Sequence, residues 1–294
     1  MNGIEKEYQI TGHTKLTGLL GSPVSHSISP LMHNKAFQML GLNYVYLCFD
    51  IKENQLKETL NGLSHLQIRG FNCTMPLKTK MFELADEVSK SASFIGAVNT
   101  VVFENGKFIG YNTDGIGYMM AVKEAGHSII GKKMTLLGAG GAATAICAQA
   151  AIDGVKEIDV FNRKGPRFHQ TAQFIQKLNR GTDCTVSLYD INDTTQLKKS
   201  IQSSAILTNG TSVGMAPNTE ACPIPDSSFL HPELIISDAI YNPKETRLMK
   251  MGKKVGCPVM NGLYMLLFQG SEAFRLWTGM DMPVEIIKHD VIDQ

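Results

Sequence analysis

The feature that most constrains the fold is a glycine-rich run directly after an apolar, β-rich segment. Residues 133–137 continue into Gly138-Ala139-Gly140-Gly141-Ala142-Ala143, after which the composition is alanine-rich and helical. A strand, tight turn and helix in this order let a pyrophosphate approach the backbone N–H groups at the helix start. We therefore expect a dinucleotide-binding turn. The alternative is a glycine-rich turn that serves only close packing of a strand on a helix.

The chain around this turn alternates short β-rich runs with segments of helical period, which is typical of an α/β protein. In the second half we expect strands at residues 133–137, 157–161, 185–188, 205–209, 234–238 and 258–260. Because helical stretches lie between most of them, the sequence predicts a doubly wound, Rossmann-type parallel sheet.

The first half predicts a separate α/β domain, because 294 residues exceed the usual length of a single domain. We expect strands at residues 14–21, 44–51 and 68–73, a helix capped by Ser29, and a helix over residues 76–88. Helices at residues 263–277 and 283–290 are expected to return to this domain. The expected boundaries are residues 1–116 with 263–294 for the first domain and 117–262 for the Rossmann-type domain.

Asn105-Gly106 is a two-residue hairpin turn signal between β-rich flanks. Continuing the pairing outward from the turn, Asn99 faces Asn112 at the open end of the hairpin. Asp114 lies just beyond that end. The hairpin therefore brings Asn99 and Asp114 together, although they are well separated in the chain.

Asn72, Thr74 and Lys78 form a second candidate group. Asn72 and Thr74 come at the end of an expected strand, where alternation points both side chains to one face. Lys78 falls in the first turn of the following helix, where the positive end of the helix dipole disfavours a cation. An isolated lysine is ordinarily a surface residue, but this unusual placement makes Lys78 a candidate for chemistry.

Two further segments combine hydroxyl, amide and carboxylate groups. Residues 112–115 precede an expected helix, and Asp114 is either its N-cap or a functional carboxylate at the end of the hairpin. Residues 26–30 place the hydroxyls of Ser27 and Ser29 around a helix start, which suits a carboxylate ligand. A plain N-cap role for Ser29 is the competing interpretation.

The strand at residues 157–161 ends in Asn162-Arg163-Lys164, with Arg167 close by. A site for NAD usually places an acidic residue at this point, where it accepts hydrogen bonds from the ribose 2′-hydroxyl. Cationic side chains instead suit the 2′-phosphate of NADP. The alternative is a basic turn that only faces solvent. We expect NADP to be accepted, and NAD as well.

Composition narrows the classes of partner. Lys and Arg total 28 against 27 Asp and Glu, so no overall field favours nucleic acid or an anionic membrane. Residues 134–152 carry no charge, but their glycines and alanines favour a buried strand, turn and helix over a membrane span. The cysteines and histidines show no metal-ligand spacing, so no metal site is expected. Scattered cysteines without a signal-peptide pattern predict a cytoplasmic protein.

Taken in order, these segments make the chain resemble the shikimate dehydrogenase family, most closely its quinate/shikimate dehydrogenase branch. The resemblance extends over nearly the whole chain. It rests on residues 21–30 (Gly-Ser-Pro-Val-Ser-His-Ser-Ile-Ser-Pro), Asn72-x-Thr74-x-Pro76-x-Lys78, residues 96–100 (Gly-Ala-Val-Asn-Thr), residues 112–115, residues 138–142, Asn162-Arg163, residues 209–215 (Asn-Gly-Thr-x-x-Gly-Met), Tyr241-Asn242-Pro243, Gln269-Gly270 and Trp277-Thr278-Gly279. Their ordered occurrence is far more specific than any one of them.

The resemblance implies a reversible NAD(P)-linked oxidation of shikimate to 3-dehydroshikimate in aromatic amino acid biosynthesis, with quinate as a candidate second substrate. Lys78 and Asp114 would form the catalytic pair. Substrate contacts would come from Ser27, Ser29, Asn72, Thr74, Asn99, Tyr241 and Gln269, with the two serines at the carboxylate. Cofactor contacts would come from Gly138, Ala139, Gly140, Gly141, Ala142, Asn162, Arg163, Lys164, Ala239 and Gly262. The branch often has Asp where Gly165 stands here, which weakens the expectation of an NAD preference.

The resemblance also implies that the first domain binds the substrate and the second the dinucleotide, with the active site between them. The oligomeric state stays open, and a homodimer is allowed. Another two-domain dehydrogenase, of the methylenetetrahydrofolate type, would share the glycine-rich turn without needing the serine pair. A dinucleotide-sensing protein without catalysis would retain residues 138–142 and could lose Lys78 or Asp114. The presence of both residues favours an enzyme.

Overall fold

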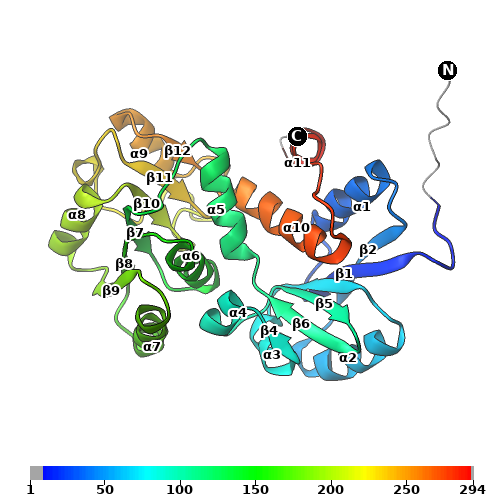
Figure 1. Ribbon diagram of the computed structural model, residues 1–294. Helices are drawn as coiled ribbons and strands as arrows, with labels where there is room; N and C mark the ends of the chain where they lie inside the picture. The colour runs from blue at the N-terminus through cyan, green and yellow to red at the C-terminus, as the bar shows by residue number, and fades with distance from the viewer. Residues whose placement is uncertain (1–8, 293–294) are drawn as a thin grey trace, which may run out of the picture. The chain divides into compact units, whose positions relative to one another are not determined.

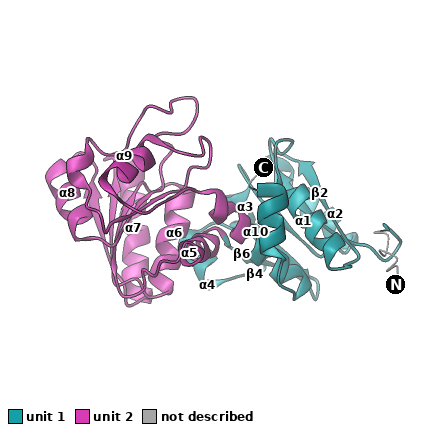
Figure 2. Cartoon of the chain, turned by 90° about the horizontal axis from the view of Figure 1, so that it is seen from above, with its two compact units in different colours: residues 1–113, 270–294 teal, residues 114–269 magenta. Residues whose placement is uncertain are grey.

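The computed structural model of the chain describes residues 9–292. The chain forms two compact units, which Figure 2 shows in different colours. One unit contains residues up to Thr113 together with those from Gly270 onward, and the other runs from Asp114 to Gln269. Each unit has its own six-stranded sheet.

The sheet of the first unit has the strand order β2-β1-β3-β5-β6-β4. Its strands are β1 (Lys15–Gly21), β2 (Tyr44–Asp50), β3 (Gly70–Cys73), β4 (Glu87–Val88), β5 (Thr100–Glu104) and β6 (Lys107–Tyr111). β1 pairs in parallel with both β2 and β3, whereas β5 runs antiparallel to β3 and β6. The amino end of β5 therefore lies at the same sheet edge as the carboxyl ends of β1 and β3.

Helices cover both faces of this sheet. They are α1 (Ser29–Met39), α2 (Leu56–His65), α3 (Lys78–Leu84), α4 (Lys90–Ile95), the second part of α10 (Leu263–Thr278) and α11 (Val284–Ile287), with a 3₁₀ turn at Glu53–Gln55 and a π-helical turn at Lys288–Ile292. On one face, α2 and α3 pack Leu60 and Met81 into a core with Phe71 of β3. On the other face, α1 and α10 bury aromatic rings, including Phe37 and Phe274 with centroids 5.1 Å apart.

The helix expected over residues 76–88 is wrong in its second half. α3 ends at Leu84, and the chain then forms β4 beside β6. The backbone N–H of Asp86 donates to the Phe108 carbonyl at 2.9 Å, and the Asp86 carboxylate accepts the Phe108 N–H at 2.8 Å. Pairing with a strand distant in sequence overrides the helical spacing of the apolar residues, which is only a local signal.

The expectation that Ser29 caps α1 is also wrong. The helix begins at Ser29, and its N-cap position is Ile28, which supplies no side-chain cap. Ser27 Oγ accepts the Ser29 backbone N–H at 3.2 Å. The Ser29 side chain instead lies close to the Tyr46 hydroxyl.

The sheet of the second unit has the order β12-β11-β10-β7-β8-β9, and every neighbouring pair is parallel. Its strands are β7 (Lys133–Leu137), β8 (Glu157–Asn162), β9 (Thr185–Asp190), β10 (Ile206–Asn209), β11 (Ile235–Asp238) and β12 (Val259–Met260). Numbered from β7, this is the doubly wound order of dinucleotide-binding sheets. The Rossmann-type prediction is confirmed, and the expected strand ends differ from the observed ones by two residues at most.

Helices flank this sheet on both sides (Figure 1). α5 (Asp114–Glu124), α6 (Gly141–Ile152) and α7 (Pro166–Gly181) lie on one side, and α8 (Thr194–Ser203) and α9 (Arg247–Val255) lie on the other. A 3₁₀ turn at Ser227–Phe229 precedes β11. The side chains of Leu197 in α8 and Leu248 in α9 share a core with Leu207 and Ile236 of the sheet.

Two glycines let α5 approach its neighbouring helices. A Cβ on Gly115 would collide with the Ala145 carbonyl of α6. A Cβ on Gly117 would lie 2.5 Å from the backbone nitrogen of Gln269 in α10. These contacts fix the first turn of α5, which begins with Asp114. No helix within residues 9–292 combines the length and apolarity required to cross a membrane.

Candidate functional site

Polar residues of the first unit gather at one edge of its sheet, where the loops after β1 and β3 lie against each other. The Ser22 N–H donates to the Met75 carbonyl at 2.9 Å. Gly21 permits this approach, because a Cβ there would collide with the Thr74 methyl group. The loop that leads to residues 26–30 therefore lies directly against residues 72–78, so the two predicted segments are neighbours.

The hairpin register follows the sequence prediction, with Glu104 paired with Lys107. At its open end, Asn99 Oδ1 accepts the Thr113 N–H at 2.8 Å, and Asn99 Nδ2 donates to Thr113 Oγ1 at 3.1 Å. Asp114 is the next residue and the first of α5. The start of α5 is thus tied through its preceding residue to Asn99.

Asn72 is the centre of a buried hydrogen-bond network. Its Oδ1 accepts the Tyr46 hydroxyl at 2.8 Å, while its Nδ2 donates to the Asn99 carbonyl at 3.2 Å and to Thr100 Oγ1 at 2.9 Å. An amide has two N–H donors and an oxygen with two lone pairs. Asn72 can therefore accept one more hydrogen bond but has no N–H left to donate.

Tyr46 is a member of this network that no sequence motif identified. It is fully buried on β2, and burial raises the pKa of its hydroxyl well above the usual range. The hydroxyl donates to Asn72 Oδ1 and lies close to the Ser29 side chain. The alternation of Tyr44 and Tyr46 on one strand is the only local signal, and it does not reveal which residues the rings face.

His33 packs on Tyr46, with ring centroids 4.5 Å apart and planes 16° from parallel. Phe274 and Trp277 of α10 also lie against it, with centroids at 6.3 Å and 5.2 Å. Neither ring nitrogen of His33 has a hydrogen-bond partner among residues 9–292. Burial lowers the pKa of His33 to about 3, so the ring is neutral at pH 7. The stack holds the ring of Tyr46 in place.

Lys78 is half-buried and is the first residue of α3. Its backbone carbonyl accepts the Val98 N–H at 2.9 Å, which joins the helix start to the residue before Asn99. The Cys73 N–H donates to the Asn99 carbonyl at 2.8 Å. These bonds bring Asn72, Thr74, Lys78 and Asn99 to one end of the first sheet.

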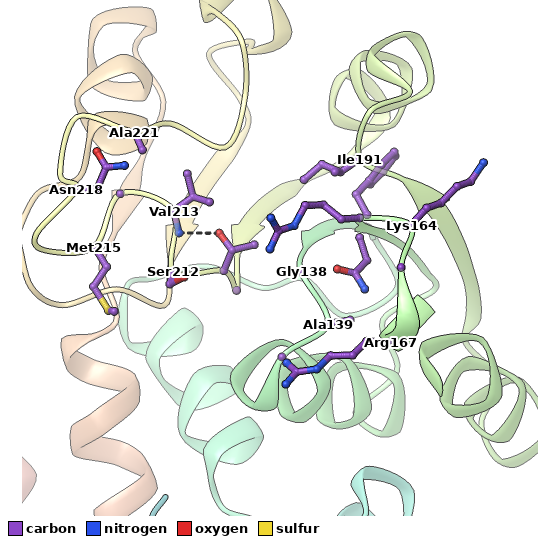
Figure 3. Close-up of a pocket in the computed structure, with 18 of the residues that line it drawn as sticks. Gly138, Ala139, Lys164, Arg167, Ile191, Ser212, Val213, Met215, Asn218 and Ala221 are labelled. Atoms are coloured by element: carbon purple, nitrogen blue, oxygen red, sulfur yellow. Dashed lines mark hydrogen bonds between the residues drawn. The ribbon is translucent and has the colours of Figure 1, made fainter. Parts of the chain in front are cut away.

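The second unit contains a cavity of about 1170 Å³ at the carboxyl ends of its central strands (Figure 3). Its lining comes from residues 138–140, residues 161–167 and residues 210–218, with Ile191 and Ala221. The chain reverses its winding direction between β7 and β10, and ligands of doubly wound sheets bind at such a point.

The glycine-rich turn forms one wall of this cavity. Gly138 has φ +98°, a conformation that favours glycine, and a Cβ there would lie 2.8 Å from Thr211 Cγ2. Gly140 precedes α6, and a Cβ there would meet no atom within 4 Å. The first glycine makes the turn, and the second leaves open space beside the N–H groups at the helix start. These residues fit the pyrophosphate of a dinucleotide.

Asn209 shapes another wall, although no role was assigned to it from the sequence. Its Oδ1 accepts the Thr211 N–H at 3.1 Å and the Thr211 hydroxyl at 2.6 Å. Its Nδ2 donates to the Val213 carbonyl at 3.2 Å and to Asp238 Oδ1 at 3.1 Å. Burial raises the pKa of the Asp238 carboxyl, against the effect of these hydrogen bonds. The segment Asn-Gly-Thr is the signal that marks this wall in the sequence.

The basic residues after β8 occupy the third wall. Arg163, Lys164 and Arg167 all belong to the lining. In Figure 3, Arg167 points to the same side of the cavity as Ala139, whereas Lys164 points away from the other labelled residues. The Lys164 side chain is 73% exposed. Asp159 of β8 is buried and pairs with Lys133, outside the cavity lining.

Other residues with a predicted cofactor role lie outside the lining. Gly141 and Ala142 belong to the first turn of α6. Ala239 and Gly262 follow β11 and β12 and touch each other, because a Cβ on Gly262 would collide with the Ala239 carbonyl. The structure thus brings Gly138, Ala139, Gly140, Asn162, Arg163 and Lys164 to one cavity and forms a second, separate contact from Ala239 and Gly262.

Two residues with a predicted substrate role belong to the second unit. Tyr241 is 49% exposed in the loop after β11. Gln269 lies on α10, where its Nε2 donates to the Leu266 carbonyl at 3.0 Å. Within residues 9–292, no three His, Cys, Asp or Glu side chains are grouped so that they could hold a metal ion.

Comparison with known proteins gives matches over both units. A model of the shikimate dehydrogenase substrate binding domain matches residues 19–101, and a model of the shikimate 5′-dehydrogenase C-terminal domain matches residues 262–290. The chain is 43% identical over 279 residues to the quinate/shikimate dehydrogenase of Escherichia coli, covering 95% of this chain and 97% of that protein.

Higher similarity is found to proteins of Listeria monocytogenes. The chain is 51% identical over 280 residues to a shikimate dehydrogenase (NADP(+)), covering 95% of this chain and 96% of that protein. The crystal structure of a Listeria monocytogenes shikimate 5-dehydrogenase in complex with shikimate and NAD has a TM-score of 0.93 and 51% identity, covering 96% of this chain and 97% of that one. With half of the residues identical over nearly the full length, the chain belongs to the shikimate dehydrogenase family.

Proposed function

We propose that the chain catalyses the reversible oxidation of shikimate to 3-dehydroshikimate, with NADP as cofactor and NAD as an alternative. One observation carries this proposal. The chain has both a group of polar side chains around Asn72 and Asn99 at one end of its first sheet and a cavity of about 1170 Å³ whose wall includes a glycine-rich turn. The relatives named shikimate dehydrogenase and quinate/shikimate dehydrogenase agree with it.

Lys78 and Asp114 handle the proton of the reacting ring hydroxyl in this proposal. A ring carbon that loses a hydride becomes a carbonyl only if its hydroxyl also loses its proton, so a base must contact that oxygen. When bound, the nicotinamide ring supplies the hydride acceptor. An amine and a carboxylate that both contact this oxygen can pass the proton between them. The surroundings of Asn99 support a common site for the two residues. The N–H of Val98, the residue before Asn99, donates to the Lys78 carbonyl, and the N–H of Thr113, the residue before Asp114, donates to Asn99 Oδ1.

The substrate contacts proposed are Ser27 and Ser29 at the carboxylate, and Asn72, Thr74, Asn99, Tyr241 and Gln269 at the ring and its hydroxyls. The network around Asn72 restricts how that residue takes part. Because both of its N–H donors are used, Asn72 can only accept a hydrogen bond from a ring hydroxyl. A compound that lacks this hydroxyl would leave the Asn72 oxygen incompletely bonded, which a site built for a hydroxyl strongly disfavours.

The cofactor contacts proposed follow the walls of the cavity. Gly138, Ala139 and Gly140, with Gly141 and Ala142 in the same turn, receive the pyrophosphate. Asn162, Arg163 and Lys164 line the wall expected beside the adenosine ribose, where positive charge favours a 2′-phosphate. Ala239 and Gly262 contribute to the nicotinamide pocket in this proposal, and their backbones approach so closely that a Cβ on Gly262 would collide with the Ala239 carbonyl.

Three further expectations belong to this proposal. Quinate is a second substrate, because it presents a carboxylate and ring hydroxyls to the same residues. The enzyme acts in the cytoplasm. A homodimer is the oligomeric state to be tested, by size-exclusion chromatography with light scattering.

The deciding experiment follows the absorbance of reduced nicotinamide in purified enzyme with NADP or NAD. Shikimate, quinate and unrelated secondary alcohols are compared, and methylenetetrahydrofolate is included for the alternative dehydrogenase class. We expect turnover with shikimate and NADP, weaker turnover with quinate, and none with simple alcohols. Silence with both ring acids would overturn the proposal. Tight dinucleotide binding without turnover on any substrate would instead indicate a sensing protein.

A further inference from the structure

An acidic residue stands beside the basic wall of the cavity, although none follows β8 in the sequence. Asp190 ends β9, and β9 pairs in parallel with β8 so that Asp190 lies opposite Asn162. The Ile191 N–H donates to the Asn162 carbonyl at 3.1 Å, and Ile191 itself lines the cavity. Pairing of the two strands therefore places the Asp190 carboxylate next to two residues that line the cavity where the ribose is expected, although Asp190 itself is not part of the lining.

The carboxylate of Asp190 is held in a defined place. Its Oδ1 accepts the backbone N–H of Asn192 at 3.1 Å and the Asn192 Nδ2 at 3.2 Å. Its side chain is only 20% exposed. Asp190 is thus a fixed negative charge and not a freely moving surface acid.

Lys164 is the flexible partner of this charge. Its Nζ lies 3.9 Å from Asp190 Oδ2, and its side chain is 73% exposed. Figure 3 shows it pointing away from the residues around it, whereas Arg167 points to the glycine-turn side of the cavity. A long lysine stem adopts many conformations, and a fixed carboxylate nearby favours those that keep the ammonium group beside it.

We propose that Asp190 is a specificity residue that withholds Lys164 from the 2′-phosphate of NADP and so narrows the preference of the chain for NADP over NAD. This inference rests on the proposed function in that it takes the cavity as the dinucleotide site. Arg163 and Arg167 alone then supply positive charge for the phosphate. Without the carboxylate, the Lys164 ammonium is free to join them.

Asp190→Asn tests the inference, because asparagine keeps an oxygen for Asn192 and removes the charge. Calorimetric titration with NADP and with NAD gives the two Kd values without any turnover. We expect NADP to bind about two- to five-fold more tightly, the range of an exposed ion pair, and NAD binding to change by less. Asp183→Asn is the matched control, since this substitution also removes one negative charge, from a residue in the exposed loop before β9. It should leave both Kd values unchanged.

The double variant Asp190→Asn with Lys164→Met distinguishes two ways in which Asp190 could weaken NADP binding: by holding Lys164, or by repelling the phosphate directly. If Asp190 acts by holding Lys164, removing its charge in the Lys164→Met background gives no gain in NADP affinity. A gain that persists there means direct repulsion of the phosphate and overturns the proposal. Unchanged or weaker NADP binding in Asp190→Asn overturns it as well. The gain should also shrink at high salt, because salt screens exposed charges.

The same titrations distinguish failure of this inference from failure of the proposed function. A wild type that binds both dinucleotides but does not oxidise shikimate refutes the function and leaves the Asp190→Asn result to decide the inference. A wild type that binds neither dinucleotide refutes both. Turnover with shikimate, combined with an Asp190→Asn variant that behaves as the wild type, refutes only the inference.

Discussion

His33, whose neutral imidazole packs against Tyr46, makes the stability of the first unit depend on pH. In the unfolded chain His33 binds a proton near pH 6.5, whereas burial lowers its pKa to about 3 in the folded chain. Between these values the unfolded state holds more protons, so acidification favours unfolding. The dependence is about 1.4 kcal/mol for each pH unit in this window.

We expect His33→Phe to remove this dependence, because phenylalanine preserves the stack against Tyr46 and Phe274 without a titratable group. Between pH 7 and pH 5, the wild type should lose about 2 kcal/mol more of its unfolding free energy than the variant. Urea unfolding at both pH values measures the two losses. Equal losses would show that His33 does not titrate differently in the folded and unfolded chains.

We expect Lys78→Ala to lower kcat about 100-fold or more, the usual loss when a positioned acid or base is removed. Lys80→Ala is the matched control, since Lys80 lies on the same helix and pairs with Glu83 at the surface at 2.6 Å. Steady-state rates with shikimate give kcat for both variants. If the two variants keep equal, near-wild-type rates, Lys78 has no part in the chemistry.

At the scale of elements, helix glycines have opposite effects according to what surrounds them. In α5, Gly117 faces the backbone of α10, where an added Cβ would lie 2.5 Å from the Gln269 nitrogen and 2.7 Å from the Met265 carbonyl. In α2, Gly62 is exposed and an added Cβ would meet nothing within 4 Å. The first glycine permits a helix contact, and the second only makes the unfolded chain more flexible.

We expect Gly117→Ala to destabilise the second unit by about 1–3 kcal/mol, because backbone atoms cannot yield as a side chain would. Gly62→Ala should stabilise the first unit by about 0.5–1 kcal/mol, the helix propensity gained over glycine. Thermal unfolding followed by circular dichroism measures both. A Gly117→Ala variant as stable as the wild type, or more stable, would mean that α5 does not depend on close contact with α10.

Sequence patterns predicted strands and helices best where nearby residues determine where each of them begins and ends. In the second unit, the apolar run before Gly138 and the turns between strands place every strand. In the first unit, β4 was not predicted because a two-residue strand has no periodicity of its own. Its formation depends on Asp86 pairing with Phe108, which is remote in sequence. The role of Ser29 was wrong for a similar reason, because its side chain lies close to Tyr46, a residue of another element.

At the scale of the whole molecule, the candidate site could be predicted where one segment supplies several contacts, as in the glycine-rich turn and residues 162–164. The network around Asn72 could not, because its members come from four separate strands and loops. Asp190 shows the same limit. Its relation to Lys164 appears only after β8 and β9 pair, and no sequence spacing encodes that neighbour.

Trp277 is the single tryptophan and lies buried in the first unit, where its Nε1 donates to the Val101 carbonyl at 2.9 Å. Its fluorescence therefore reports on that unit, whereas circular dichroism reports on both. Because α10 continues from Gln269 into Gly270 without a break, we expect the units to unfold together. NADP at 100 times its Kd should then stabilise both signals by about 2.7 kcal/mol. A shift in circular dichroism without one in fluorescence would show independent unfolding.

The division of the chain has a consequence for its synthesis. The ribosome releases the first 113 residues long before those from Gly270 onward, so the second unit can fold while the first is still unfinished. Until Phe274 and Trp277 emerge, Phe37 and Tyr46 have an uncovered aromatic face. A chain interrupted before that point displays this face to chaperones and proteases. Only a chain translated past Trp277 can cover this face, so the second part of α10 completes the aromatic core of the first unit.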